Sequence, residues 1–166
     1  MSALRRRLSE EDGFTLLELM VTVLIIAIML ALAIPSMLGA RKRANDRAAQ
    51  ANLRNALTAE KTYYSDRQAY TADVATSPAG DLELVEGSLT YAAGFPVSTS
   101  KANTIYVTTA NTNVTNDTVC VTVRSGSGSY FGIRDVASAS AAVTYYSNST
   151  TAPTSCTSAF PSTTGF

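Results

Sequence analysis

The sequence predicts an α+β protein: a long N-terminal hydrophobic helix, over about residues 14–66, whose C-terminal half packs on a small antiparallel β-sheet head. Residues 14–40 are almost uninterruptedly apolar, and residues 44–64 contain no Pro or Gly. Short runs rich in β-branched and aromatic residues follow residue 103. A long stretch without helix breakers favours a helix, and short β-branched runs between turn residues favour strands.

The composition excludes several chemistries. The chain has 166 residues, 13 Lys plus Arg against 13 Asp plus Glu, two Cys and no His. Without His, no Ser-His-Asp or Cys-His catalytic pair can form, and two Cys cannot make a four-thiolate zinc site. A net charge of zero argues against a basic field over the whole protein that would attract nucleic acid. We therefore expect no catalytic residues, no metal and no cofactor, and a protein that is not an enzyme.

The apolar segment at residues 14–40 contains a single charged side chain, Glu18. About 20 apolar residues are enough to cross a hydrocarbon core of roughly 30 Å as a helix. The segment is either a cleaved secretory signal, a plain membrane anchor, or a helix retained after a short leader is removed. The acids at residues 10–12 and Glu18 argue against a secretory signal. Basic residues on both sides leave the orientation of a plain anchor open.

The order of residues around Gly13 favours the third interpretation. The hexapeptide GFTLLE at residues 13–18, followed by the apolar run, closely resembles the class III signal of type IV prepilins and pseudopilins. The resemblance is strongest over residues 10–70. It implies the type IV pilin fold, cleavage between Gly13 and Phe14 by a membrane prepilin peptidase, and N-methylation of Phe14.

The resemblance also implies an organisation and a location. The expected segments are a leader (1–13), a transmembrane and filament-core helix (14–40), its amphipathic continuation (41–66) and a head (67–166) made of a loop (67–88), an antiparallel sheet (89–146) and a tail (147–166). The precursor would span the inner (cytoplasmic) membrane once, with its head outside the cytoplasm, and would then enter an extracellular pilus. Its partners would be membrane lipid, prepilin peptidase, the inner-membrane assembly machinery and copies of itself.

Glu18 is the candidate residue for the register of assembly. Cleavage would give Phe14 a free α-amino group, which is cationic at neutral pH. In the family, the carboxylate of an incoming subunit is thought to meet the N-terminal amine of its neighbour. Such a buried pair fixes alignment more than stability, because desolvation nearly cancels the attraction. Alternatively, Glu18 complements the dipole of its own helix, an effect of about 0.3–1 kcal/mol.

The second half of the predicted helix has an apolar face. Ala49, Leu53, Ala56, Leu57 and Tyr64 recur with the 3.6-residue period of a helix. At 1.5 Å per residue the complete helix would be about 80 Å long. Only this half can pack on the head, so the apolar half requires lipid or copies of itself as cover.

Pro35 and Gly39 are the predicted weak points of the helix. Proline removes a backbone hydrogen bond and clashes with the preceding turn, so we expect a kink near Pro35. The alternative is that Pro35 marks the point at which the helix leaves the bilayer.

Charge is segregated along the chain. Residues 41–70 carry seven basic and three acidic side chains, whereas residues 71–166 carry three basic and six acidic ones. The cluster Arg41-Lys42-Arg43 and Arg47 is typical of a stop-transfer or headgroup anchor. Nucleic-acid binding by this cluster is a weaker alternative, and no other feature of the sequence indicates it. Inside a fibre we expect these bases to pair with acids of neighbouring heads.

The head is predicted to be a sheet. The expected strands are residues 104–110, 118–124, 130–134 and 142–146, with a hairpin loop at 125–129. Alternation places Val119, Val121 and Val123 on one face, which we expect to lie against the helix.

Cys120 falls within a predicted strand and Cys156 within the Ser/Thr-rich tail. In an exported head, a single pair of Cys predicts a disulfide. The resemblance agrees, because pilins often have a disulfide-closed C-terminal loop. The alternative is a buried free thiol and an exposed one.

The function implied by the resemblance is a structural subunit of a type IV pilus, an extracellular fibre used in adhesion, motility, aggregation or DNA uptake. One alternative is a pseudopilin of a type II secretion system, which is similar over residues 13–40. The absence of a recognisable calcium-loop pattern in the tail argues against it. A membrane-anchored envelope binding module is an alternative from a different class.

Overall fold

The computed structural model describes residues 13–72, 81–110, 117–137 and 143–156. The chain divides into two compact units, Met1–Ala40 and Arg41–Phe166. The described part of the first unit is dominated by the beginning of helix α1 (Leu16–Arg67), and the second unit holds the rest of α1 and the head. Apart from Gly13, the predicted leader lies outside the described residues.

Helix α1 agrees with the predicted helix to within two residues at each end. It ends at Arg67 because Gln68 has a positive φ of 56°, and the Gln68 N–H donates to the Tyr64 carbonyl (2.8 Å). This left-handed residue after the last turn is a common way to close a helix. Pro35 lies inside α1, which continues through it. The kink near Pro35 stays a prediction.

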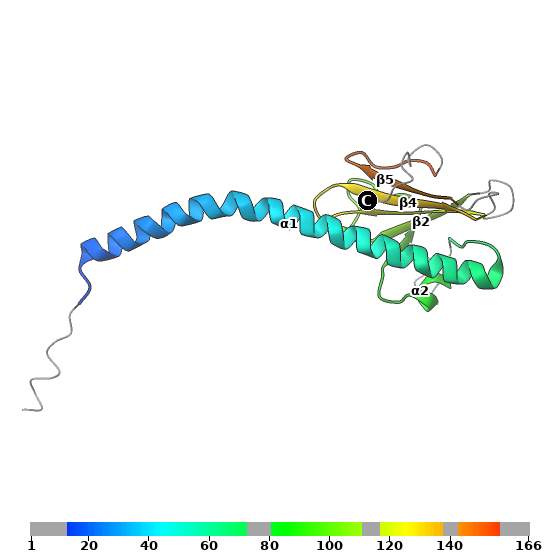
Figure 1. Cartoon of the computed structure of the whole chain (residues 1–166), viewed down its shortest axis with the longest axis horizontal. Helices are drawn as coiled ribbons and strands as arrows, with labels where there is room; N and C mark the ends of the chain where they lie inside the picture. Colours follow the sequence, from blue (N-terminus) through cyan, green and yellow to red (C-terminus); the bar gives the residue numbers. More distant parts are fainter. Residues whose placement is uncertain (1–12, 73–80, 111–116, 138–142, 157–166) are drawn as a thin grey trace, which may run out of the picture. The chain divides into compact units, whose positions relative to one another are not determined.

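The head contains a short helix and one five-stranded sheet (Figure 1). Its elements are α2 (Asp81–Val85), β1 (Tyr91–Ala93), β2 (Ile105–Ala110), β3 (Thr118–Arg124), β4 (Tyr130–Val136) and β5 (Val143–Ser149). The strand order is β1-β2-β3-β4-β5. Neighbours from β2 to β5 are antiparallel, as predicted, but β1 is parallel to β2. The sheet is therefore mixed, and the prediction of a wholly antiparallel sheet is wrong.

Strand β1 was missed because it is three residues long and is defined by its pairing with β2. The chain turns out of β1 at Gly94, whose φ of 91° suits glycine, and the Gly94 N–H donates to the Val107 carbonyl (3.0 Å). Helix α2 lies in the predicted loop at 67–88. Five residues are too few for helical periodicity to be visible in the sequence.

The core lies between the sheet and the second half of α1. Val107, Val121, Ile133 and Tyr146 are successive cross-strand partners and form one row across the sheet. This row belongs to the same hydrophobic cluster as Leu53 of α1. The predicted inward-facing valines of β3 and the predicted apolar face of α1 lie in or against this cluster, so both predictions are confirmed.

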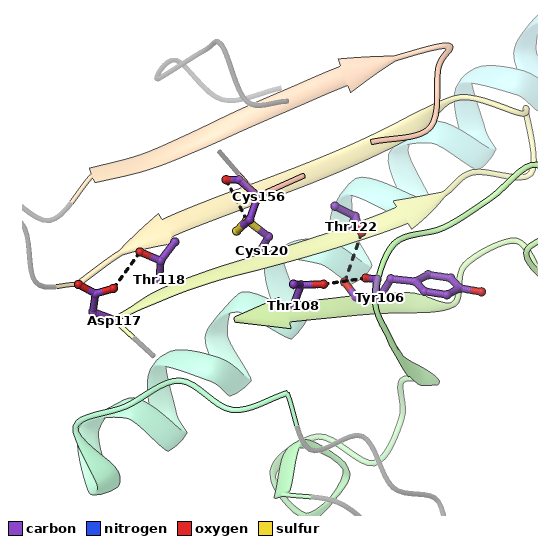
Figure 2. The surroundings of a disulfide bond; sticks show 8 residues. Tyr106, Thr108, Asp117, Thr118, Cys120, Thr122 and Cys156 are labelled. Atoms are coloured by element: carbon purple, nitrogen blue, oxygen red, sulfur yellow. Dashed lines mark hydrogen bonds between the residues drawn. A yellow bond between two sulfur atoms is a disulfide. The ribbon is translucent and has the colours of Figure 1, made fainter. Parts of the chain in front are cut away.

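A disulfide joins Cys120 of β3 to Cys156, which follows β5. Figure 2 shows Cys156 lying against β3 at Cys120. Because Val119 and Val121 face α1, alternation turns Cys120 to the opposite face of the sheet. There the two Cys pack with Phe95, Ala110 and Tyr145. The predicted pairing is confirmed, and it attaches the segment after β5 to the centre of the sheet.

Replacing both cysteines by serine should destabilise the head. The disulfide closes a sequence separation of 36 residues, for which the chain-entropy model gives about 3–4 kcal/mol. Urea unfolding of the full chain in detergent, followed by tyrosine fluorescence, measures the loss, because the chain has eight Tyr and no Trp. The control Thr154→Ala changes an exposed residue beside the bridge and should unfold as the wild type does. An unchanged midpoint in Cys120→Ser/Cys156→Ser would contradict the expected stabilisation.

Candidate functional site

The N-terminal signal lies directly before the start of α1. Gly13, Phe14 and Thr15 precede the helix, and the Glu18 N–H donates to the Thr15 hydroxyl (3.2 Å). Thr15 is therefore the N-cap of α1, and Glu18 occupies the position at which Glu or Gln completes a capping box. The cap explains why α1 begins at Leu16. Cleavage before Phe14 would leave this cap intact on the mature chain.

The first half of α1 presents an uncovered apolar surface. From Phe14 to Leu38 the large apolar side chains are 47–82% exposed. Burying one such side chain contributes about 1.5–3 kcal/mol, so leaving them all in water is strongly unfavourable. By its length and apolar composition, helix α1 could cross a membrane.

The predicted assembly residues are distributed along this helix. Glu18 lies in the first turn of α1, exposed like its neighbours, while Pro35 and Gly39 lie about five turns further on. The predicted disulfide residues Cys120 and Cys156 belong to the other unit, Arg41–Phe166. No group of three His, Cys, Asp or Glu that could hold a metal ion occurs in the described part of the chain.

Asp46 attaches the second half of α1 to the β3–β4 hairpin. The hydroxyls of Ser125 (2.7 Å) and Ser127 both donate to Asp46 Oδ1. The hairpin loop is closed by the Ser125 N–H donating to the Ser129 carbonyl (2.8 Å), and Gly128 has the positive φ that the turn requires. The predicted loop at 125–129 is confirmed, but its role in holding Asp46 was not predicted.

Asp135 of β4 joins four segments of the head. Its carboxylate accepts hydrogen bonds from the hydroxyls of Tyr70 (2.5 Å) and Thr144 (2.5 Å), and it lies 3.2 Å from the ammonium of Lys61. Asp135 is 3% exposed, so these partners compensate the cost of burying its charge. Burial, followed by the bond to Asp135, raises the pKa of the Tyr70 phenol above its ordinary value. Tyr70 is therefore a neutral donor at neutral pH.

Glu60 is buried at the centre of the α1 face that packs on the head, with 0% exposure. The Thr71 N–H donates to its Oε2 (3.3 Å), whereas neither Oε1 nor the buried Tyr91 hydroxyl has a hydrogen-bond partner among the described residues. Burial disfavours the charged form and raises the pKa of Glu60 from 4.5 to about 8. Sequence reasoning missed this residue, although Glu60 continues the helical spacing of Ala49, Leu53 and Ala56.

Comparisons with known proteins identify a sequence motif at the N-terminus of this chain. A sequence model of the prokaryotic N-terminal methylation motif matches residues 9–34. This match includes the predicted cleavage point, Thr15 and Glu18. The chain therefore carries a prokaryotic N-terminal methylation motif, which overlaps the predicted class III signal.

Two curated type IV pilus proteins are similar to part of this chain. The chain is 39% identical over 79 residues to the type IV wide pilus major component PilA4 of Thermus thermophilus, covering 48% of this chain and 60% of that protein. It is 41% identical over 59 residues to the type IV major pilin protein PilA of Myxococcus xanthus, covering 36% of this chain and 27% of that protein. No solved structure matches significantly. The motif, the two relatives and the fold together support a type IV pilin.

The buried Glu60 should make the stability of the head depend on pH. Between pH of about 4.5 and about 8 the folded chain keeps a proton that the unfolded chain has lost. The free energy of unfolding therefore falls as the pH rises through this window. Since one pKa unit corresponds to about 1.4 kcal/mol, the expected fall is several kcal/mol.

Glu60→Gln keeps the shape of the side chain and removes its titration. Urea unfolding of the full chain in detergent should show little of this pH dependence in Glu60→Gln, which should exceed the wild type in stability at pH 8. The control Asp66→Asn removes an exposed carboxylate of the same helix and should keep the wild-type pH dependence. A wild-type chain whose unfolding midpoint is constant from pH 5 to 8 would show that Glu60 is ionised in the fold.

Proposed function

We propose that this chain is the structural subunit of a type IV pilus, processed after Gly13 and polymerised through its apolar helix into an extracellular fibre. The observation that carries the proposal is the exposure of the apolar side chains of α1 between residues 14 and 38. A surface of this size requires a cover. Lipid supplies it before assembly, and the same helices of other copies supply it within a fibre.

The signal and the helix together support a route from the membrane to the fibre. The N-terminal motif and α1 fit a membrane-anchored precursor. In our proposal the precursor spans the inner membrane once with its head outside the cytoplasm. A prepilin peptidase cleaves between Gly13 and Phe14, Phe14 is N-methylated, and assembly machinery in the same membrane extracts the subunit. The fibre then serves adhesion, motility, aggregation or DNA uptake.

Glu18 is the proposed register residue of this assembly. Cleavage creates a cationic amine at Phe14, and the Glu18 carboxylate of another copy is its complement in a medium of low dielectric constant. The cap at Thr15 gives Glu18 a second, local role, because residues at its position complete the capping box. An experiment on Glu18 must therefore separate the charge from the cap.

Three variants make this separation. Glu18→Gln removes the charge but keeps a capping-box residue, Glu18→Ala removes both, and Thr15→Ala removes the N-cap at a cost of about 1 kcal/mol while keeping the charge. We expect all three to be cleaved before Phe14. Filaments should be lost in both Glu18 variants and retained in Thr15→Ala. Electron microscopy and immunoblots of sheared filaments measure assembly, and the mass of the N-terminal peptide measures processing.

Normal filaments from Glu18→Gln would refute the register role of the charge. A wild-type chain that is absent from sheared filaments and stays in the envelope would refute the proposal that it is a pilus subunit. In that case the retained chain would match the pseudopilin or the anchored binding module instead.

A further inference from the structure

Two charged surfaces lie on different flanks of the second half of α1. Ala49, Leu53 and Ala56 face the sheet. Successive residues advance by about 100° around a helix, so Arg43 and Arg47, four residues apart, share a flank that points away from the sheet. Both arginines are exposed. We call this pair the basic flank.

The second surface is a groove between α1 and α2. Its volume is about 220 Å³, and it is lined by Asn55, Thr58, Ala59, Thr62, Val85 and Glu86. Pockets for small molecules usually measure roughly 300–1,000 Å³, so this groove suits the end of a side chain better than a cofactor. Beside it, α2 carries Glu83 and Leu84, and Leu84 is 75% exposed. We call the groove with Glu83 and Glu86 the acidic groove.

The charges of both surfaces are available for an external partner. Glu86 Oε1 accepts hydrogen bonds from the N–H (3.2 Å) and hydroxyl (2.6 Å) of Ser88, which hold the pKa of Glu86 below its ordinary value. Glu86 is therefore ionised at neutral pH. Glu83 and Glu86 form no ion pair with any residue of the described chain, and neither do Arg43 and Arg47.

We propose that the basic flank of one copy docks on the acidic groove of a neighbouring copy, with Arg43 and Arg47 facing Glu83 and Glu86. The proposal rests on the proposed function, because it requires copies to assemble. Opposite charges on two surfaces of one chain fix register and orientation between copies. The aliphatic stems of the arginines would also cover the exposed Leu84.

This contact is heterologous, since the two surfaces are different. Each copy that binds a neighbour through one surface keeps the other surface free, so the contact propagates into an open filament. The centres of the two surfaces are separated by about a quarter-turn around α1 and by about 20 Å along it. Parallel neighbours in direct contact should therefore be displaced by about 20 Å along the axis of α1.

Charge reversal in the full-length chain tests this contact. Arg43→Glu/Arg47→Glu and Glu83→Lys/Glu86→Lys should each reduce sheared filaments by about tenfold or more, because like charges then face each other. The chain with all four reversals should recover a large part of the wild-type amount. The control Lys101→Glu reverses an exposed charge outside both surfaces and should assemble as the wild type does. The amount of protease-resistant head in the membrane shows whether each variant folds.

A second measurement does not depend on reversed charges. Full-length chains with Arg47→Cys and Glu86→Cys should form a ladder of disulfide-linked copies when filaments are treated with a mild copper oxidant. Arg47→Cys alone should form none. A ladder of the double variant supports the contact even where a charge-reversed chain fails to fold.

Several outcomes would overturn the proposal. Wild-type filaments from either reversed chain would do so, as would the lack of recovery in the fourfold variant with a folded head, or the absence of a ladder. Depletion of Arg43→Glu/Arg47→Glu from the membrane, with normal assembly of Glu83→Lys/Glu86→Lys, would assign the basic flank to lipid headgroups instead. In all these cases wild-type filaments remain, whereas their absence would refute the proposed function itself.

Discussion

The apolar half of α1 has to be removed from water, and this constraint shapes the rest of the chain. Its large side chains are exposed from Phe14 onward, and lateral burial in lipid or among other copies is the way to cover a single helix of this kind. In the proposed assembly this half of the helix passes from lipid into a fibre, so it has to stay free of contacts with its own head. The contacts that fix the head, through Asp46, Lys61 and the core, lie instead on the second half of α1.

The head combines an apolar core with two buried carboxyl groups, Asp135 and Glu60, whose surroundings differ. Asp135 has a cation and two hydroxyl donors, so its charge is compensated. Glu60 has one backbone donor and a raised pKa, so it is accommodated by staying protonated. The disulfide of Cys120 and Cys156 adds a covalent link on the other face of the sheet. Such a link would suit a small domain that is exported, as in the proposed function.

Sequence patterns predicted those elements whose signal is long or repeated. The apolar run, the 3.6-residue face of α1 and the alternating valines of β3 all have several residues that point to one structure. The three-residue strand β1 and the five-residue helix α2 have too few residues for a period, and β1 exists because Ile105 pairs with Tyr91. The burial of Glu60 was missed because charged residues are normally absent from the buried face of a helix. The role of Asp46 was missed because its partners are 79 and 81 residues away in the sequence.

Electron cryomicroscopy of sheared filaments shows whether the apolar half of α1 forms the core of a fibre. We expect fibres of this chain that begin at Phe14 and bury residues 14–40 of neighbouring copies together in a lipid-free core. Fibres in which these residues face solvent would refute the proposed assembly. So would preparations in which the chain is found only in the membrane, with the leader still attached.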